Sequence, residues 1–101
     1  MNITLQYFDD CPNWQTTGHH LDQLIAEGLD LTVSYERIDS EEKAVEKQFH
    51  GSPTVLVDGV DLFAEEFTPV ALACRMYRTD RGLAGSPTLD QLRDVISAAT
   101  S

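Results

Sequence analysis

Tyr7-Phe8-Asp9-Asp10-Cys11-Pro12-Asn13-Trp14 is the stretch in which a strand gives way to a helix, and it carries one of the chain's two cysteines. The residues before it are rich in β-branched and aromatic side chains, which predicts a strand over residues 2–8. After it, apolar residues recur at helical spacing, which predicts a helix over residues 12–27. Pro12 suits the first helical position, because the N–H that proline lacks has no helical partner there.

Cys11 is therefore expected at the start of this helix, where unpaired backbone N–H groups and the positive end of the helix dipole stabilise a thiolate. The thiolate is the nucleophilic form of cysteine, so this position predicts a reactive sulfur that is more accessible than that of Cys74. Asp9 and Asp10 act in the opposite direction, because nearby negative charge disfavours the thiolate. The alternative is an inert, buried cysteine.

The same periodicities predict the remaining regular elements of the chain. They are strands over residues 31–38, 54–57 and 60–63, and helices over residues 41–49 and 87–99. The resulting order, β-α-β-α-β-β-α, predicts an α/β fold with a mixed four-stranded sheet in one domain, residues 1–101.

Local signals mark the ends of these elements. Asp39 and Ser40 are expected to cap the helix over 41–49, and Asp58-Gly59 is a strong hairpin signal. The segment between residues 64 and 86 is an insertion before the last helix. Within it we expect a helical turn after Pro69, a short strand over 74–78 and a loop over 79–85.

The tetrapeptide Gly-Ser-Pro-Thr occurs twice, at residues 51–54 and 85–88. The first copy precedes a β-branched run, so Pro53 should lead into a strand. The second precedes a helical pattern, so Ser86 should cap a helix that starts at Pro87 through an ordinary trans bond.

Two motifs carry a resemblance to known proteins: Cys-Pro-Asn-Trp at 11–14 and Gly-Ser-Pro-Thr-Val-Leu-Val-Asp-Gly at 51–59. With the element order, they resemble the thioredoxin fold in its short, glutaredoxin-like form over residues 1–63 and 87–99. More narrowly, the chain is similar to a group of small bacterial thioredoxin-like proteins that also carry a late Cys-Arg-x-Tyr. Some members of that group are labelled alkylmercury-lyase-like.

The resemblance implies that Cys11 is the nucleophile of a thiol–disulfide oxidoreductase and that Pro53 is the cis proline facing it. Trp14 stands where the dithiol motif has its second cysteine, so Cys11 has no local partner to release a mixed disulfide. Cys74 is the candidate resolving thiol, and the alternative is a core residue of the insertion. The residues implied to contact substrate are Pro12, Trp14, Ser52 and Pro53.

Charge and composition narrow the classes of partner. The chain has 17 acidic and 7 basic residues and a formal net charge of −10, which argues against binding nucleic acid or an anionic membrane. No run reaches the ~20 apolar residues of a membrane span, and no signal peptide is evident, so we expect a cytoplasmic protein. The expected partner is a protein or small-molecule thiol or disulfide, and the expected state is a monomer without a cofactor.

The histidines are not expected at the reactive centre. His19 and His20 should lie on the surface of the first helix, and His50 should be a solvated loop residue, although it could pair with the Cys11 thiolate. No cluster has the spacing of a zinc site. Two other functions stay open: a thioredoxin-like binding module or one-thiol sensor, and capture of a soft metal such as mercury by Cys11 with Cys74.

Overall fold

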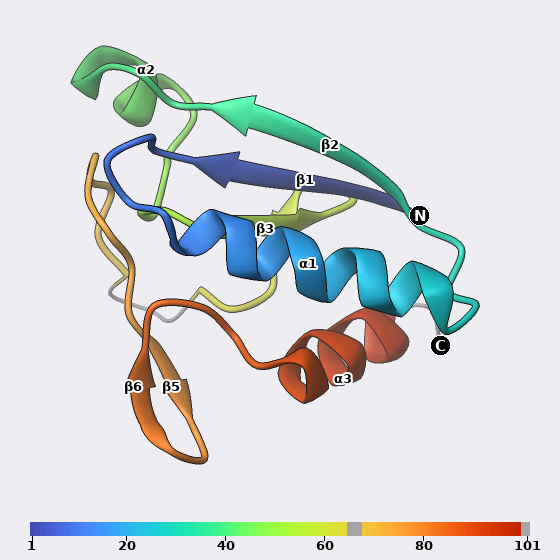
Figure 1. Ribbon diagram of the computed structural model, residues 1–101. Helices are drawn as coiled ribbons and strands as arrows, with labels where there is room; N and C mark the ends of the chain where they lie inside the picture. The colour runs from blue at the N-terminus through green and yellow to red at the C-terminus, as the bar shows by residue number, and fades with distance from the viewer. Residues whose placement is uncertain (65–67, 100–101) are drawn as a thin grey trace.

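The computed structural model describes residues 1–64 and 68–99, which form a mixed α/β fold (Figure 1). Its elements in chain order are β1 (Asn2–Tyr7), α1 (Asn13–Ala26), β2 (Thr32–Arg37), α2 (Glu41–Glu46), β3 (Thr54–Val57), β4 (Val60–Asp61), β5 (Tyr77–Thr79), β6 (Gly82–Ala84) and α3 (Leu89–Ala99). The predicted order is confirmed, and the insertion contributes the two extra strands β5 and β6.

Four strands form one sheet in the order β2-β1-β3-β4. β1 pairs with β2 in parallel, while β3 is antiparallel to both β1 and β4, so the predicted mixed sheet is confirmed. A two-residue turn at Asp58-Gly59 joins β3 to β4, where both residues have positive φ, as a tight hairpin requires. This turn also supports β1, because the Asp58 carboxylate accepts a hydrogen bond of 2.8 Å from the backbone N–H of Asn2.

Helices α1 and α3 lie side by side against the sheet (Figure 1). Their apolar stripes face the two central strands, because a helix buries every third or fourth residue and a strand every second one. The buried residues of this core are Ile3, Leu5, Leu21, Leu24, Val55, Val57, Leu92 and Ile96. A smaller second cluster joins Ile38, Ala44 and Phe49 near the end of β2.

The predicted helix over 41–49 is too long, because it ends at Glu46. Gln48 has a φ of 52°, in the left-handed region, so the chain leaves the helix there and Phe49 turns into the second cluster. At the other end the N-cap is Ser40, whose hydroxyl accepts a hydrogen bond of 3.1 Å from the Lys43 N–H. Asp39 therefore precedes the cap instead of sharing it.

The last helix begins later than predicted, at Leu89. Thr88 and Gln91 form a reciprocal capping box, in which the Thr88 hydroxyl accepts from the Gln91 N–H and the Gln91 side chain accepts from the Thr88 N–H. Ser86 is not the cap, because its hydroxyl lies 2.7 Å from that of the buried Thr17 on α1. The bond before Pro87 is trans, as predicted.

The insertion departs most from the prediction. The expected loop over 79–85 is a hairpin, β5–β6, in which Tyr77 pairs with Ala84 and Thr79 with Gly82. The expected strand over 74–78 begins only at Tyr77. The helical turn expected after Pro69 is absent from residues 68–73, and residues 65–67 lie outside the described part of the chain.

Among the residues that the structure describes, no helix has the length and apolar character needed to cross a membrane.

Substitution of Leu92 tests the contribution of the core formed by α1, α3 and the sheet to the stability of the fold. The side chain is 0% exposed, so Leu92→Ala leaves a cavity and should lower the free energy of unfolding by about 2–5 kcal/mol. Leu83→Ala is the matched control: Leu83 is 67% exposed on β6, and its loss should cost less than about 0.5 kcal/mol. Urea denaturation of both variants measures the difference, and equal costs would contradict this core.

Candidate functional site

Cys11 and Cys74 are joined by a disulfide, although they are 63 positions apart in the sequence. Their Cα atoms are 5.7 Å apart, within the usual range for a disulfide. The open question of whether Cys74 reaches Cys11 is therefore answered in favour of the pair. No other cysteine is present in the chain.

The predicted accessibility of the two cysteines is wrong. Cys11 is 0% exposed, whereas Cys74 lies on the surface. The helix itself begins at Asn13, with Pro12 as its N-cap residue, so Cys11 precedes the helix by two residues. The backbone N–H of Cys11 donates to the Phe8 carbonyl at 3.0 Å, which closes a turn and directs the cysteine inward.

Two polar groups lie beside the Cys11 sulfur. The carbonyl oxygen of Ser52 is 3.6 Å from Sγ, and the side-chain amide nitrogen of Asn13 is 3.8 Å from it. In the reduced protein the Ser52 carbonyl favours the neutral Cys11 thiol, from which it can accept a hydrogen bond. The Asn13 amide favours the thiolate, to which it can donate one. The buried sulfur therefore has a hydrogen-bonding neighbour in either protonation state.

Ser52 connects both cysteine-bearing segments to the sheet. It is 0% exposed, and its peptide bond to Pro53 is cis, as predicted. Its N–H donates to the Ala73 carbonyl at 2.8 Å and its carbonyl accepts from the Arg75 N–H at 2.9 Å. Its hydroxyl accepts from the Phe8 N–H at 2.9 Å, at the end of β1. Ser52 thus fixes the chain just before Cys11 and the chain on both sides of Cys74.

Gly51 permits this close pairing. Its φ is +104°, a backbone angle that residues other than glycine rarely adopt. A Cβ atom at this position would lie 3.0 Å from the Arg75 Cβ and 3.2 Å from the Ala73 carbonyl oxygen. The glycine of the first Gly-Ser-Pro-Thr copy is therefore required both by its backbone angle and by the neighbouring insertion.

A buried ionic cluster holds the residue after Cys74. The Arg75 guanidinium lies 2.7 Å from an Asp61 carboxylate oxygen, and both side chains are only 7% exposed. The Nδ1 atom of His50 lies 2.7 Å from the same oxygen. His50 is therefore neither a solvated loop residue nor, in this structure, a partner of Cys11. Buried charges need such partners, so Asp61 ties the insertion to β4.

Tyr77 provides a second buried anchor two residues further along. Its hydroxyl donates to the carbonyl oxygen of Pro53, and the Arg75 guanidinium lies 4.7 Å from the centre of its ring. Burial raises the pKa of the Tyr77 phenol well above its usual value, and the Asp61 carboxylate adds to this, while Arg75 lowers it. The phenol therefore stays protonated and keeps donating at neutral pH.

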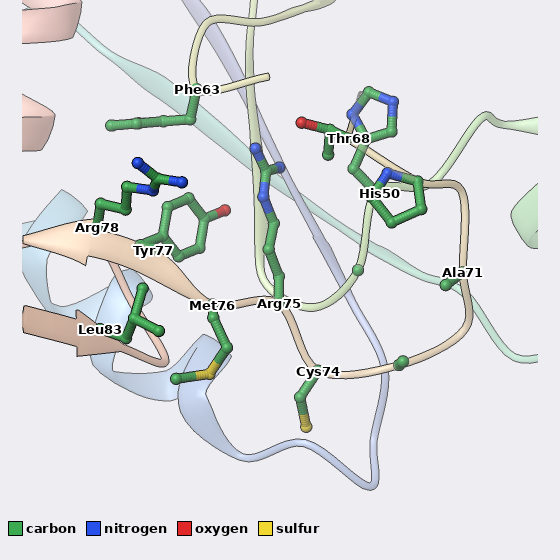
Figure 2. Close-up of a pocket in the computed structure, with 13 residues that line it drawn as sticks. His50, Phe63, Thr68, Ala71, Cys74, Arg75, Met76, Tyr77, Arg78 and Leu83 are labelled. Atoms are coloured by element: carbon green, nitrogen blue, oxygen red, sulfur yellow. The ribbon is translucent and has the colours of Figure 1, made fainter. Parts of the chain in front are cut away.

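A pocket of about 630 Å³ opens beside Cys74 (Figure 2). Its apolar lining includes Phe63, Ala71, Met76 and Leu83. In Figure 2 the Cys74 and Met76 side chains point to one side of their extended segment, and Arg75 and Tyr77 point to the other. Cys11 does not contribute to this pocket.

Trp14 lies on the sheet side of α1. Its ring stacks on that of Tyr7 with centroids 4.5 Å apart, and it meets Tyr35 edge-on at 6.0 Å. It also contacts the main core. The position that holds a second cysteine in the dithiol motif is thus used here to pack the start of α1 against β1 and β2.

Several residues of the site could not be identified from sequence signals alone. Asn13 is one: its amide fills the space in which a Cβ atom of Gly85 would lie, 2.1 Å from Nδ2. Asp61 is another. Arg75 and Tyr77 belong to the late Cys-Arg-x-Tyr motif, but the motif alone does not indicate their buried partners. The second Gly-Ser-Pro-Thr copy, which begins at Gly85, marks the close approach of Asn13 as well as the nearby helix start.

Both other histidines were predicted on the surface of the first helix, and the structure confirms this for only one of them. His19 is exposed, as expected, whereas His20 is half-buried and its Nδ1 atom has no hydrogen-bond partner among the described residues. Within residues 1–64 and 68–99, no three His, Cys, Asp or Glu side chains gather as metal ligands would. No protein-family model, no curated protein and no solved structure matches this chain.

The buried phenol of Tyr77 predicts an alkaline loss of stability. Because its pKa is raised in the folded state, unfolding releases a proton once the pH exceeds about 10, the usual tyrosine value, and stability falls from there upward. Tyr77→Phe should cost about 1 kcal/mol at pH 7 through the lost hydrogen bond, and should flatten this decline. Chemical denaturation from pH 7 to 11 compares the slopes, and identical slopes would contradict the assignment.

Proposed function

We propose that the protein is a thiol–disulfide oxidoreductase with a thioredoxin-like fold, in which Cys11 and Cys74 form the redox-active pair. The element order, the parallel β1–β2 pair and the antiparallel β3–β4 hairpin agree with the arrangement that the sequence resemblance implies. A cis proline next to the Cys11 sulfur also agrees with it. A reducing compartment such as the cytoplasm would let the pair cycle between its two states.

One observation carries the proposal: the disulfide joins a cysteine of the αβ scaffold to a cysteine of the insertion, at the surface and beside a pocket. Disulfides that exchange must be reached by a thiolate, and Cys74 is exposed. A second cysteine from the insertion supplies the partner that Trp14 removes from the local motif. The pair can thus release a mixed disulfide internally, as a Cys-x-x-Cys pair does.

The four residues expected to contact substrate differ in their exposure to solvent. Pro12 is exposed and can border a bound substrate, whereas Trp14 is half-buried and packs on Tyr7. Ser52 and Pro53 are buried in the disulfide form. We assign to them the positioning of the two sulfurs, through the contacts of Ser52 with Ala73 and Arg75. The substrate would be a thiol or disulfide carried by a small molecule or by a protein.

Among the other functions, a one-thiol sensor and a soft-metal site need a free thiolate, whereas a non-catalytic binding module needs none. A one-thiol sensor is disfavoured by the disulfide, since it leaves no free cysteine. Capture of a soft metal such as mercury would require reduction first, and the two sulfurs would then be its ligands. Titration of the reduced protein with Hg²⁺ distinguishes this function, because the metal would be held without any turnover of a disulfide.

The reduction potential of the pair tests the proposed function. Equilibration with glutathione redox buffers should give a two-electron transition at roughly −120 to −270 mV, the range of proteins that exchange disulfides. Catalysed reduction of 2-hydroxyethyl disulfide should accompany it, and Cys74→Ser should abolish both the transition and the turnover. A potential below about −300 mV without turnover would identify a structural disulfide and contradict the proposal.

A further inference from the structure

We propose that Cys74, and not Cys11, is the sulfur that exchanges with substrate, and that the substrate is a small thiol or disulfide with an apolar group. This inference rests on the proposed function and assigns the order of its two steps. It reverses the roles expected from the sequence, where the cysteine before the helix is the attacking one.

Access to the two sulfurs differs sharply. Thiol–disulfide exchange requires the attacking thiolate to reach one sulfur of the disulfide directly. Cys11 is 0% exposed and is enclosed by Ser52 and Asn13. Cys74 is exposed and lines the pocket, which Cys11 does not. An external thiolate can therefore reach the disulfide only from the Cys74 side.

The extended backbone around Cys74 separates its side chain from those of Arg75 and Tyr77. Side chains of an extended segment alternate between two faces, so Cys74, bonded to Cys11, shares one face with Met76, while Arg75 and Tyr77 share the other (Figure 2). Asp61 holds Arg75 inward, and the Pro53 carbonyl holds Tyr77 inward. These two buried anchors fix the direction in which the Cys74 sulfur points.

Two exposed apolar side chains lie near Cys74. Met76 is 57% exposed and Leu83 is 67% exposed, and both line the pocket, whose lining also includes the polar side chains of His50, Thr68 and Arg78. The volume of about 630 Å³ is in the range of small-molecule sites. An aromatic or aliphatic group attached to the reacting sulfur would bury area against Met76 and Leu83.

The proposed reaction consists of two thiol–disulfide exchanges. In the reduced protein the Cys74 thiolate attacks one sulfur of a disulfide R–S–S–R, forming Cys74–S–S–R and releasing R–S⁻, which takes a proton from water. The Cys11 thiolate then attacks the Cys74 sulfur, releases the second R–S⁻ and forms the Cys11–Cys74 bond. The substrate gains two electrons and two protons, and the cysteine pair loses them. Reduction of the protein by two R–SH runs through the same steps backwards.

Single-cysteine variants test this order. Reduced Cys11→Ser, which keeps Cys74, should react with 2,2′-dithiodipyridine at least about tenfold faster than reduced Cys74→Ser, which keeps Cys11. Stopped-flow absorbance of the released thiopyridone measures both rates, and far-UV circular dichroism confirms that each variant is folded. A rate for Cys74→Ser that equals or exceeds that of Cys11→Ser would overturn the proposal.

The native disulfide provides an independent measurement. Oxidised wild-type protein is exposed briefly to phenylmethanethiol, quenched with acid, alkylated and digested for mass spectrometry. The thiol adduct should be on Cys74 and the alkyl group on Cys11. An adduct on Cys11 would overturn the order of the steps while leaving the proposed function intact. A disulfide that resists the thiol entirely would defeat the proposed function itself.

The apolar surface is tested in the Cys11→Ser background. Met76→Ser with Leu83→Ser should slow the reaction with the aromatic 2,2′-dithiodipyridine about fivefold, through lost apolar contact. The rate with the polar 2-hydroxyethyl disulfide should change by less than about twofold, because it gains little from that contact. Val45→Ser, which removes a 70% exposed apolar residue on α2, is the control and should change neither rate. Equal slowing of both reagents would refute the apolar specificity.

Discussion

The hydrogen bonds of Ser52 are the constraint on which the candidate site depends. Its N–H, carbonyl and hydroxyl are buried, and each has a hydrogen-bond partner, as buried polar groups require. Two of these partners, Ala73 and Arg75, flank Cys74, and the third is Phe8, three residues before Cys11. One residue at the entry to β3 thus brings together two segments that the sequence separates widely. The disulfide forms where these segments meet.

The elements of the αβ scaffold were predictable because their signals are local. Alternation and helical periodicity located β1, α1, β2 and β3 to within one or two residues at each end, and Pro53 marked the cis bond correctly. The hairpin β5–β6 was missed because Thr79 to Gly82 carries a loop-like composition. Its pairing comes from tertiary context and from a bond of 2.6 Å between the Thr79 hydroxyl and the Gly82 carbonyl.

The candidate site was only partly predictable, since its chemistry depends on contacts between distant segments. The predicted helix start correctly indicated Cys11 as a residue of the site, but the same reasoning wrongly predicted that its sulfur is accessible. Burial of this sulfur arises from Ser52 and Asn13, together with the disulfide itself. Likewise, nothing local to His50 indicates that Asp61 will hold it together with Arg75. Charges that pair across a fold leave no mark at either position in the sequence.

We infer from the hydrogen bonds of Ser52 that the fold, and not the disulfide, holds Cys74 beside Cys11. Amide hydrogen exchange of the reduced protein, followed by NMR, tests it most directly. If Ser52 positions the insertion, the N–H groups of Ser52 and Arg75 stay protected after reduction, because their acceptors, the carbonyls of Ala73 and Ser52, remain in place. Exchange of both at the rate of an unfolded chain, with β1 and β3 still protected, would contradict the account.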